Sequence, residues 1–251
     1  MILCAAGDVH GKIHLLYENI RRFEAHLGVT FAGVLQVGDL GIWPYADRVD
    51  RATRNHGGAG DFPEMWSSFE PVPLTTVFIK GNHEDFEFLG ESERFPHRPM
   101  LPNLYYLPNG QVSDYVFGGG RGRVGGVGGC YAFSSDDDPE ESDRASPYCY
   151  RSSEIDSLRD RAGINGIDVL LLHDAPDGIR VGEGGSSYDT RGPGLRRLVA
   201  EASPKICFFG HHHAALRATI SGVTTIGLNL VGRPGHLAAW DTDEGLLGLS
   251  P

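Results

Sequence analysis

The chain has 251 residues, with 33 acidic against 22 basic side chains, a net charge of −11 and a pI near 5.4. An acidic surface repels polyanions at long range, so the charge gives no sign of a nucleic-acid substrate. No apolar run approaches the roughly 18 residues of a membrane span, so we expect a cytoplasmic protein without a membrane partner.

The cysteines indicate the redox compartment. They form no CxxC pair and have no regular spacing, and two of them lie inside apolar runs: Cys4, Cys130, Cys149 and Cys207. We therefore expect buried free thiols in a reducing compartment, in preference to disulfides or zinc knuckles.

Strands and helices are predicted to alternate along the chain. Apolar or β-branched runs predict strands at residues 2–6, 33–37, 75–79, 168–172 and 205–209. Amphipathic or capped segments predict helices at residues 13–23, 85–89, 152–162 and 195–202, the third capped by Ser152 or Ser153. This alternation predicts an α/β fold.

The remaining segments are less regular. Residues 42–70 predict a helix and an irregular excursion whose aromatic side chains serve core or lid packing. Residues 104–107 and 112–117 predict a hairpin that turns at Asn109-Gly110. Residues 216–220, 223–228, 236–240 and 246–249 predict a terminal antiparallel set that closes the sheet.

Two biased segments invite functional interpretations that we set aside. Residues 118–129, GGGRGRVGGVGG, contain no GK[ST] and no following helix pattern, so they predict a turn and tightly packed strands instead of a phosphate loop. Residues 134–143, SSDDDPEESD, predict a solvated acidic loop beside the active site.

The chain is organised around residues 75–85, TTVFIKGNHED, where an apolar strand ends abruptly in polar residues. Four other apolar runs end in the same way, in AGDVHG (6–11), QVGDLG (36–41), LLLHDAP (170–176) and FFGHHHA (208–214). An open α/β sheet places its chemistry at the ends of such strands. Because the five strand ends must converge, we expect residues 1–251 to form one domain.

Together the strand ends carry eight nitrogen or oxygen donors: Asp8, His10, Asp39, Asn82, His83, His173, His211 and His213. Any one histidine alone is more often a core or surface residue than a ligand, and Asp8 alone serves equally well as a helix cap. Imidazole, carboxylate and amide donors without thiolate suit Mn, Fe, Zn or Ni. Eight donors exceed the needs of one ion, so we expect two divalent transition-metal ions.

The ordered motifs GDVHG, GDLG, GNHED, LLLHD and GHHH resemble those of the calcineurin-like metallophosphoesterase superfamily. The resemblance implies a four-layer α/β/β/α sandwich of two mixed sheets flanked by helices. It also implies one metal held by Asp8, His10 and His213, another held by Asn82, His173 and His211, and Asp39 bridging both. His83 matches the catalytic histidine, and Asp39 shares the catalytic role through the bridge.

The residues around these motifs carry further predictions. Asn82, His83 and Glu84 are expected to bind substrate, and Asp39, Glu84 or Asp85 to raise the pKa of His83. Asp85 is instead favoured as an N-terminal residue of the next helix. His212 lies between two inward neighbours, so it should point away from the metals.

The predicted activity is that of a metal-dependent phosphoesterase, most simply a phosphodiesterase. Two divalent ions can clamp phosphate oxygens and lower the pKa of a bridging water toward neutrality. GDLGIW has no counterpart of the arginine in the GDxxxRG motif, while residues 75–215 are similar in layout to lariat-debranching enzymes. We expect a nucleotide or RNA phosphodiester as substrate and infer no protein partner. The alternatives are a phosphomonoesterase or protein phosphatase, or a non-catalytic metal-binding scaffold.

Overall fold

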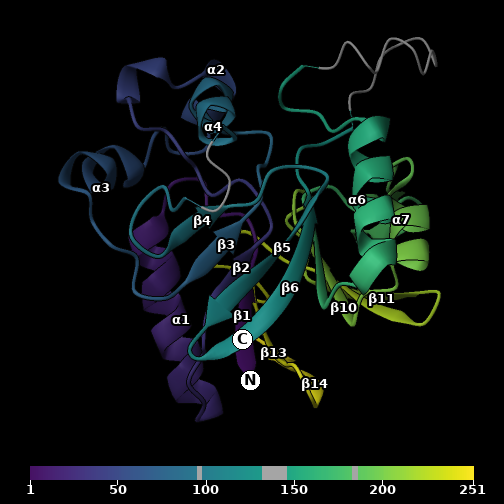
Figure 1. Ribbon diagram of the computed structural model, residues 1–251. Helices are drawn as coiled ribbons and strands as arrows, with labels where there is room; N and C mark the ends of the chain where they lie inside the picture. The colour runs from purple at the N-terminus through teal and green to yellow at the C-terminus, as the bar shows by residue number, and fades with distance from the viewer. Residues whose placement is uncertain (95–97, 132–145, 183–185) are drawn as a thin grey trace.

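The computed structural model describes residues 1–94, 98–131, 146–182 and 186–251. Two six-stranded mixed sheets face each other at the centre (Figure 1). The first sheet has the order β14 (Gly245–Leu249), β13 (Leu237–Asp241), β1 (Ile2–Ala6), β2 (Val34–Gln36), β3 (Thr76–Phe78) and β4 (Leu104–Tyr106). The second sheet has the order β11 (Leu216–Ile220), β12 (Val223–Gly227), β10 (Ile206–Phe209), β7 (Val169–Leu172), β6 (Gly120–Val127) and β5 (Gln111–Phe117).

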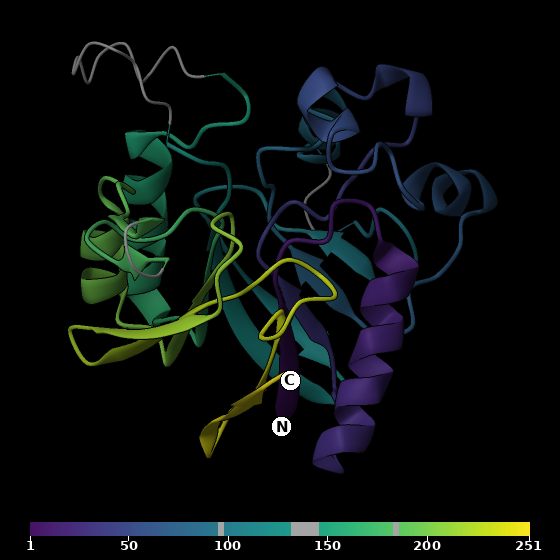
Figure 2. The ribbon, with the colours of Figure 1, turned by 180° about the vertical axis from the view of Figure 1, so that it is seen from behind.

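Helices cover the outer faces of both sheets, as the two opposite views show (Figures 1 and 2). Beside the first sheet lie α1 (Ile13–Leu27), η1 (Ala46–Arg48), α2 (Arg51–Arg54), α3 (Phe62–Ser68) and α4 (Phe86–Ser92). Beside the second lie α6 (Ser152–Asn165) and α7 (Leu195–Ala202). A separate small ribbon pairs β8 (Arg180–Val181) with β9 (Tyr188–Asp189).

Three apolar clusters separate these layers. One buries the inner face of α1 against the first sheet, through side chains such as Ile13, Leu16 and Ile20. A second packs α6 and α7 against the second sheet, and a third, which includes Leu35 and Phe208, fills the space between the sheets. Burial of both faces explains the near-continuous apolar runs of the central strands. The predicted four-layer arrangement is confirmed.

Parallel pairing brings the strand ends together. In the first sheet β1, β2 and β3 are mutually parallel, and in the second β12, β10, β7 and β6 are parallel. The polar segments that follow β1, β2, β3, β7 and β10 therefore leave their sheets in a common direction and meet at one edge.

The predicted hairpin at Asn109-Gly110 is wrong. β4 pairs in parallel with β3 in the first sheet, whereas β5 pairs with β6 in the second. The real hairpin turns at Gly118 and Gly119, whose φ values of 49° and 92° suit the tight turns that join twisted strands. Asn109 instead bonds through its side chain to the backbone of Gly128, which fastens the crossover between the sheets.

Two smaller expectations also need correction. The terminal strands do not form one antiparallel set, because β11 and β12 extend the second sheet while β13 and β14 extend the first. Helix α6 starts with Arg151 at the N-cap position, and Glu154 closes the turn by accepting the Arg151 backbone N–H; neither Ser152 nor Ser153 is the cap. The glycine-rich segment forms the β5–β6 turn and β6, as predicted.

The cysteines agree with expectation. The structure contains four free cysteines, of which Cys4, Cys149 and Cys207 are buried. Within the described ranges, no helix combines the length and the apolar character that crossing a bilayer requires. The acidic loop predicted at residues 134–143 lies outside the described residues.

Candidate metal centre

The strand ends form two overlapping groups of metal-competent side chains. Asp8, His10 and His213 make the first donor group, and Asp8, Asp39 and His173 make the second. Within each group the candidate ligand atoms lie within 4.8 Å of one another. Four loops from two sheets, those after β1, β2, β7 and β10, thus converge on one site.

The first donor group is compact, with Asp8 and His10 buried and the His213 side chain 27% exposed. His213 Nε2 lies 2.9 Å from Asp8 Oδ2 and 3.3 Å from His10 Nε2. Burial lowers the pKa of His10 to about 3, because the charged imidazolium loses its hydration. Burial acts to raise the pKa of Asp8, but the imidazoles of His213, His173 and His10 lower it to about 2. At neutral pH the group therefore offers a carboxylate and a neutral imidazole lone pair, the protonation states that metal binding requires.

The second donor group places Asp39 between the two sets of ligands. Asp39 Oδ2 lies 3.7 Å from His10 Nε2 and 3.6 Å from His173 Nε2. Asn82 Oδ1 is 2.9 Å from the same His173 nitrogen. His173 Nδ1 faces the Val37 carbonyl oxygen at 2.9 Å, which orients the ring so that Nε2 points into the site. Burial, Asp8 and Glu84 raise the pKa of Asp39, as expected of carboxylates that lie close together in a buried site.

His211 is brought beside these groups, but it is not part of either. Its ring centroid lies 5.1 Å from that of His173, and its backbone N–H donates to Asp8 Oδ1 at 3.0 Å. Its role as a ligand remains a prediction.

A divalent cation fits the donor set. Asp8 Oδ2 and His10 Nδ1 are buried polar atoms that make no well-aligned hydrogen bond in the described part of the chain, although His213 Nε2 lies 2.9 Å from Asp8 Oδ2. Such atoms carry a free-energy penalty unless something else satisfies them. A cation beside Asp8 Oδ2 would satisfy that oxygen and separate the close approach of its imidazole neighbours.

The backbone at the site is strained. His10, Asp39, His211 and His213 have left-handed φ values of 46°, 54°, 63° and 48°. Non-glycine residues adopt this region at an energetic cost, which is often found where function fixes a side-chain direction. Two neighbouring glycines let the backbone pass close to the donors. A Cβ at Gly81 would collide with Asp39, and one at Gly210 would collide with Asp8.

Glu84 does not have the predicted role in substrate binding. It is 1% exposed, and its carboxylate accepts the backbone N–H groups of Leu40 at 2.9 Å, Gly41 at 3.1 Å and Ile42 at 2.6 Å. Both oxygens are thus committed to the loop after β2. We correct its role to that of a buried anchor between the Asp39 loop and the His83 loop.

Asp85 has the expected structural role. As N-cap of α4 it accepts the Phe88 backbone N–H at 3.2 Å, and Arg48 donates to it at 2.7 Å. The favoured interpretation as a helix N-terminal residue is confirmed.

His83 lies beside both donor groups. Its backbone N–H donates to Asp39 Oδ1 at 2.8 Å, and its ring centroid is 5.3 Å from that of His10. Burial and the imidazole of His56 lower its pKa, with Asp50 and Asp8 acting in the opposite direction. The expectation that Asp39, Glu84 or Asp85 raises this pKa is therefore wrong.

One histidine at the site was not found from the sequence. His56 is exposed, and its ring stacks on His10 at 4.4 Å between centroids and 12° between planes. Its centroid is also 4.8 Å from that of His83. It lies in the irregular excursion of residues 42–70, away from any strand end, so hydrophobic periodicity gave no signal for it.

Two cavities flank the centre. A cavity of about 820 Å³ opens on the side of His211 and His212. His212 belongs to this cavity and not to a donor group, since its ring nitrogens face Asp174 and Tyr188, so it points away from the donor groups as predicted.

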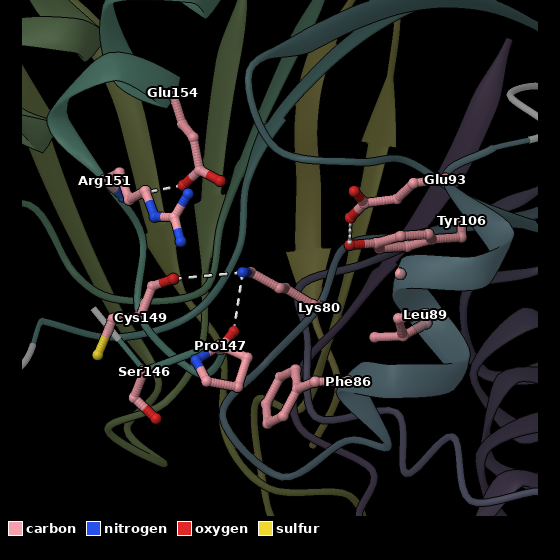
Figure 3. Close-up of a pocket in the computed structure, with 11 residues that line it drawn as sticks. Lys80, Phe86, Leu89, Glu93, Tyr106, Ser146, Pro147, Cys149, Arg151 and Glu154 are labelled. Atoms are coloured by element: carbon pink, nitrogen blue, oxygen red, sulfur yellow. Dashed lines mark hydrogen bonds between the residues drawn. The ribbon is translucent and has the colours of Figure 1, made fainter. Parts of the chain in front are cut away.

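The other cavity, of about 210 Å³, lies beside the end of β3 and contains Lys80 (Figure 3). Lys80 Nζ donates to the carbonyl oxygens of Pro147 at 2.9 Å and Cys149 at 3.2 Å. Lys80 directly precedes Gly81 and Asn82, so these bonds fasten the chain before α6 to the loop that carries the predicted ligand Asn82. The residues that line this cavity therefore support the proposed metal centre, although none of them is one of its donors.

The sequence matches a known protein family over most of its length. The family model of the calcineurin-like phosphoesterases matches residues 1–215. Lariat debranching enzymes of Caenorhabditis briggsae and Entamoeba histolytica are each 26% identical to the chain over 87% and 92% of its length. The chain spans 47% of the first and 69% of the second.

Solved structures share the fold at low sequence identity. The protein TT1561 of Thermus thermophilus superposes with a TM-score of 0.57 at 13% identity, over 96% of this chain and 94% of that one. A putative 5′-nucleotidase from Staphylococcus aureus gives 0.55 at 13% identity, over 98% and 52%. Both carry the two-sheet architecture described above.

Proposed function

We propose that this chain, which belongs to the calcineurin-like phosphoesterase family, hydrolyses a phosphodiester of a nucleotide or nucleic acid with the help of two divalent transition-metal ions. Family membership makes the chain a metal-dependent phosphoesterase. The observation that carries the finer proposal is the pair of donor groups that share the buried Asp8.

The ligands divide into two sets around Asp39. Asp8, His10 and His213 would hold one ion, and Asn82, His173 and His211 the other. Asp39 would contact both, because its Oδ2 lies at similar distances from His10 and His173. When bound, two such ions polarise phosphate oxygens and supply a nucleophile from water at neutral pH.

His83 would act on the substrate directly. Its backbone is fixed on both sides, by the N–H bond to Asp39 and by the Trp43 indole N–H, which donates to its carbonyl at 3.1 Å. This holds the imidazole beside the donor groups, where it can donate a hydrogen bond to a phosphoryl or leaving oxygen. An anionic phosphate next to the ring would raise the pKa that burial lowers, which favours the protonated form needed for proton donation.

Two features support a diester over a monoester. The loop after Asp39 continues into Ile42 and Trp43, which are 0% and 4% exposed and belong to the interior, so the GDLGIW segment supplies no arginine to the phosphate. The curated relatives quoted above are named for debranching a lariat. A diester carries less negative charge than a monoester and depends less on such a cation.

The test is hydrolysis of bis-p-nitrophenyl phosphate against p-nitrophenyl phosphate by manganese-loaded protein, with Tyr45→Ala as a surface control. We expect a higher kcat/KM for the diester. A higher value for the monoester would instead identify a phosphomonoesterase. Two bound metals with no turnover of either ester would favour the scaffold.

A further inference from the structure

The cavity beside His211 has no assigned ligand, and its size suits one. At about 820 Å³ it falls within the range of small-molecule sites, and His211 and His212 connect it to the proposed metal centre. A group covalently attached to a phosphate at the centre could therefore extend into this cavity.

Tyr188 projects its ring at the cavity in a fixed orientation. Its hydroxyl lies 2.8 Å from His212 Nδ1, and His212 Nε2 lies 3.0 Å from Asp174 Oδ1. Since a carboxylate only accepts, Nε2 carries the proton, which leaves Nδ1 to accept from the tyrosine hydroxyl. Asp174 is itself held by the backbone N–H groups of Ala175 at 2.8 Å and Tyr131 at 3.0 Å.

The fixed ring is nevertheless open to solvent. Tyr188 is 48% exposed, although its hydroxyl is bonded in a chain of three side chains that ends on the backbone. A side chain that serves only packing would bury its ring, which supplies the apolar area. An ordered ring with an accessible surface is instead suited to stacking against a planar ligand.

The charges around the cavity select an uncharged ligand portion. Asp174, Asp177 and Asp189 line it together with one arginine, Arg191. Asp189 pairs with Arg180 at 3.4 Å and Asp174 accepts from His212, so Asp177 and Arg191 are the remaining charges of this lining. These side chains leave no surplus of positive charge for a second phosphate, which favours uncharged polar groups that donate hydrogen bonds. Sugar hydroxyls and base amino groups are such donors.

We propose that this cavity binds the nucleoside attached to the scissile phosphate, with its base stacked on Tyr188. Asp174 and His212 position the tyrosine and do not take part in the reaction. The inference rests on the proposed phosphodiesterase function and names the part of the substrate that the enzyme recognises.

Two diesters with the same leaving group isolate the nucleoside contribution: thymidine 5′-p-nitrophenyl phosphate and methyl p-nitrophenyl phosphate. Base–aromatic stacking contributes enough to predict that Tyr188→Ala lowers kcat/KM about tenfold more for the thymidine ester than for the methyl ester, mainly through KM. Tyr188→Phe keeps the ring and should retain most of the preference. Tyr45→Ala, which removes a tyrosine that is 50% exposed and does not line the cavity, should leave the ratio unchanged. Equal losses on both esters in Tyr188→Ala would overturn the proposal.

A binding measurement separates this inference from the proposed reaction. Calorimetry with manganese-loaded protein compares thymidine 5′-monophosphate with methyl phosphate. Tighter binding of the nucleotide that is lost in Tyr188→Ala supports the nucleoside site, even when neither diester is hydrolysed. Equal affinity for the two ligands overturns it, whatever the diesterase assay gives.

Discussion

The two sheets contribute differently to the centre. On the first sheet, two contacts join the Asp39 loop to the His83 loop. The His83 backbone N–H donates to Asp39, and the buried Glu84 carboxylate accepts backbone N–H groups of the Asp39 loop. On the second sheet, the loop of His211 borders a cavity of about 820 Å³. We infer a division of labour: the first sheet holds Asp39 and His83 rigidly, and the second, which supplies His173 and His213, leaves room for the proposed substrate.

The largest expected effect on metal binding and activity is that of replacing Asp39. Asp39→Asn removes the charge between His10 and His173, so we expect loss of at least one of two bound metals. The fall in kcat/KM should exceed the roughly 10–100-fold typical of residues that only support a ligand. Asparagine tolerates the left-handed φ of 54° at this position, so the fold should persist. Metal analysis and thermal unfolding check both points, and two tightly held metals in this variant would contradict the bridging role.

The second largest effect should come from His83, which we expect to act on substrate and not on metal. His83→Ala should keep both metals and lower kcat by roughly 10²–10⁴-fold, the range of a lost general acid. His26→Ala, at an exposed position in the last turn of α1, is the matched control. Metal content and steady-state kinetics give the answer, and full activity in His83→Ala would remove His83 from the mechanism.

These residues also mark what a sequence can predict. The donors at strand ends were predictable, because a buried strand followed by glycine and polar residues has a fixed place in an α/β sheet. His56 was not, because its position depends on how an irregular segment folds over the site. The role of Glu84 was misjudged for a related reason: the backbone groups that it binds lie in another loop, more than forty residues away in the sequence. The hairpin failed because Asn109-Gly110 signals a turn but not which strands it joins.

Replacing Glu84 tests whether stability and activity depend on the rigid connection between the Asp39 and His83 loops. Glu84→Gln places an amide N–H against backbone donors, so we expect a loss of roughly 1–3 kcal/mol in the free energy of unfolding. A smaller fall in kcat than in His83→Ala should accompany it, because the loops shift without losing a reacting group. Denaturant unfolding and kinetics measure both, with Glu18→Gln on the exposed face of α1 as control. An unchanged unfolding free energy would show that the buried carboxylate is not an anchor.

The smallest expected effect lies at the far end of the second sheet, where Asp168 joins three strands without approaching the centre. It accepts the Arg123 backbone N–H at 2.8 Å and pairs with Lys205 at 2.9 Å. Partial burial acts to raise the pKa of Asp168, but these two contacts outweigh it and lower the pKa. Because the folded pKa lies below the unfolded value of 3.8, the stabilisation is present above pH 3.8 and is lost as pH falls through the folded value.

Asp168→Asn should therefore lower the free energy of unfolding at pH 7 by roughly 1 kcal/mol, given that the pair is partly exposed to solvent. The difference from wild type should shrink as the pH falls below about 3.8, where the unfolded chain binds a proton at Asp168 more readily than the folded protein does. Metal content and kcat should not change, because Asp168 precedes β7 whereas His173 follows it. A deficit that persists unchanged at pH 3 would show that packing, and not the carboxylate charge, holds this end of the sheet. A loss of activity at pH 7 would show that the two ends of the second sheet are coupled, and that substrate entry depends on more than the loops at the centre.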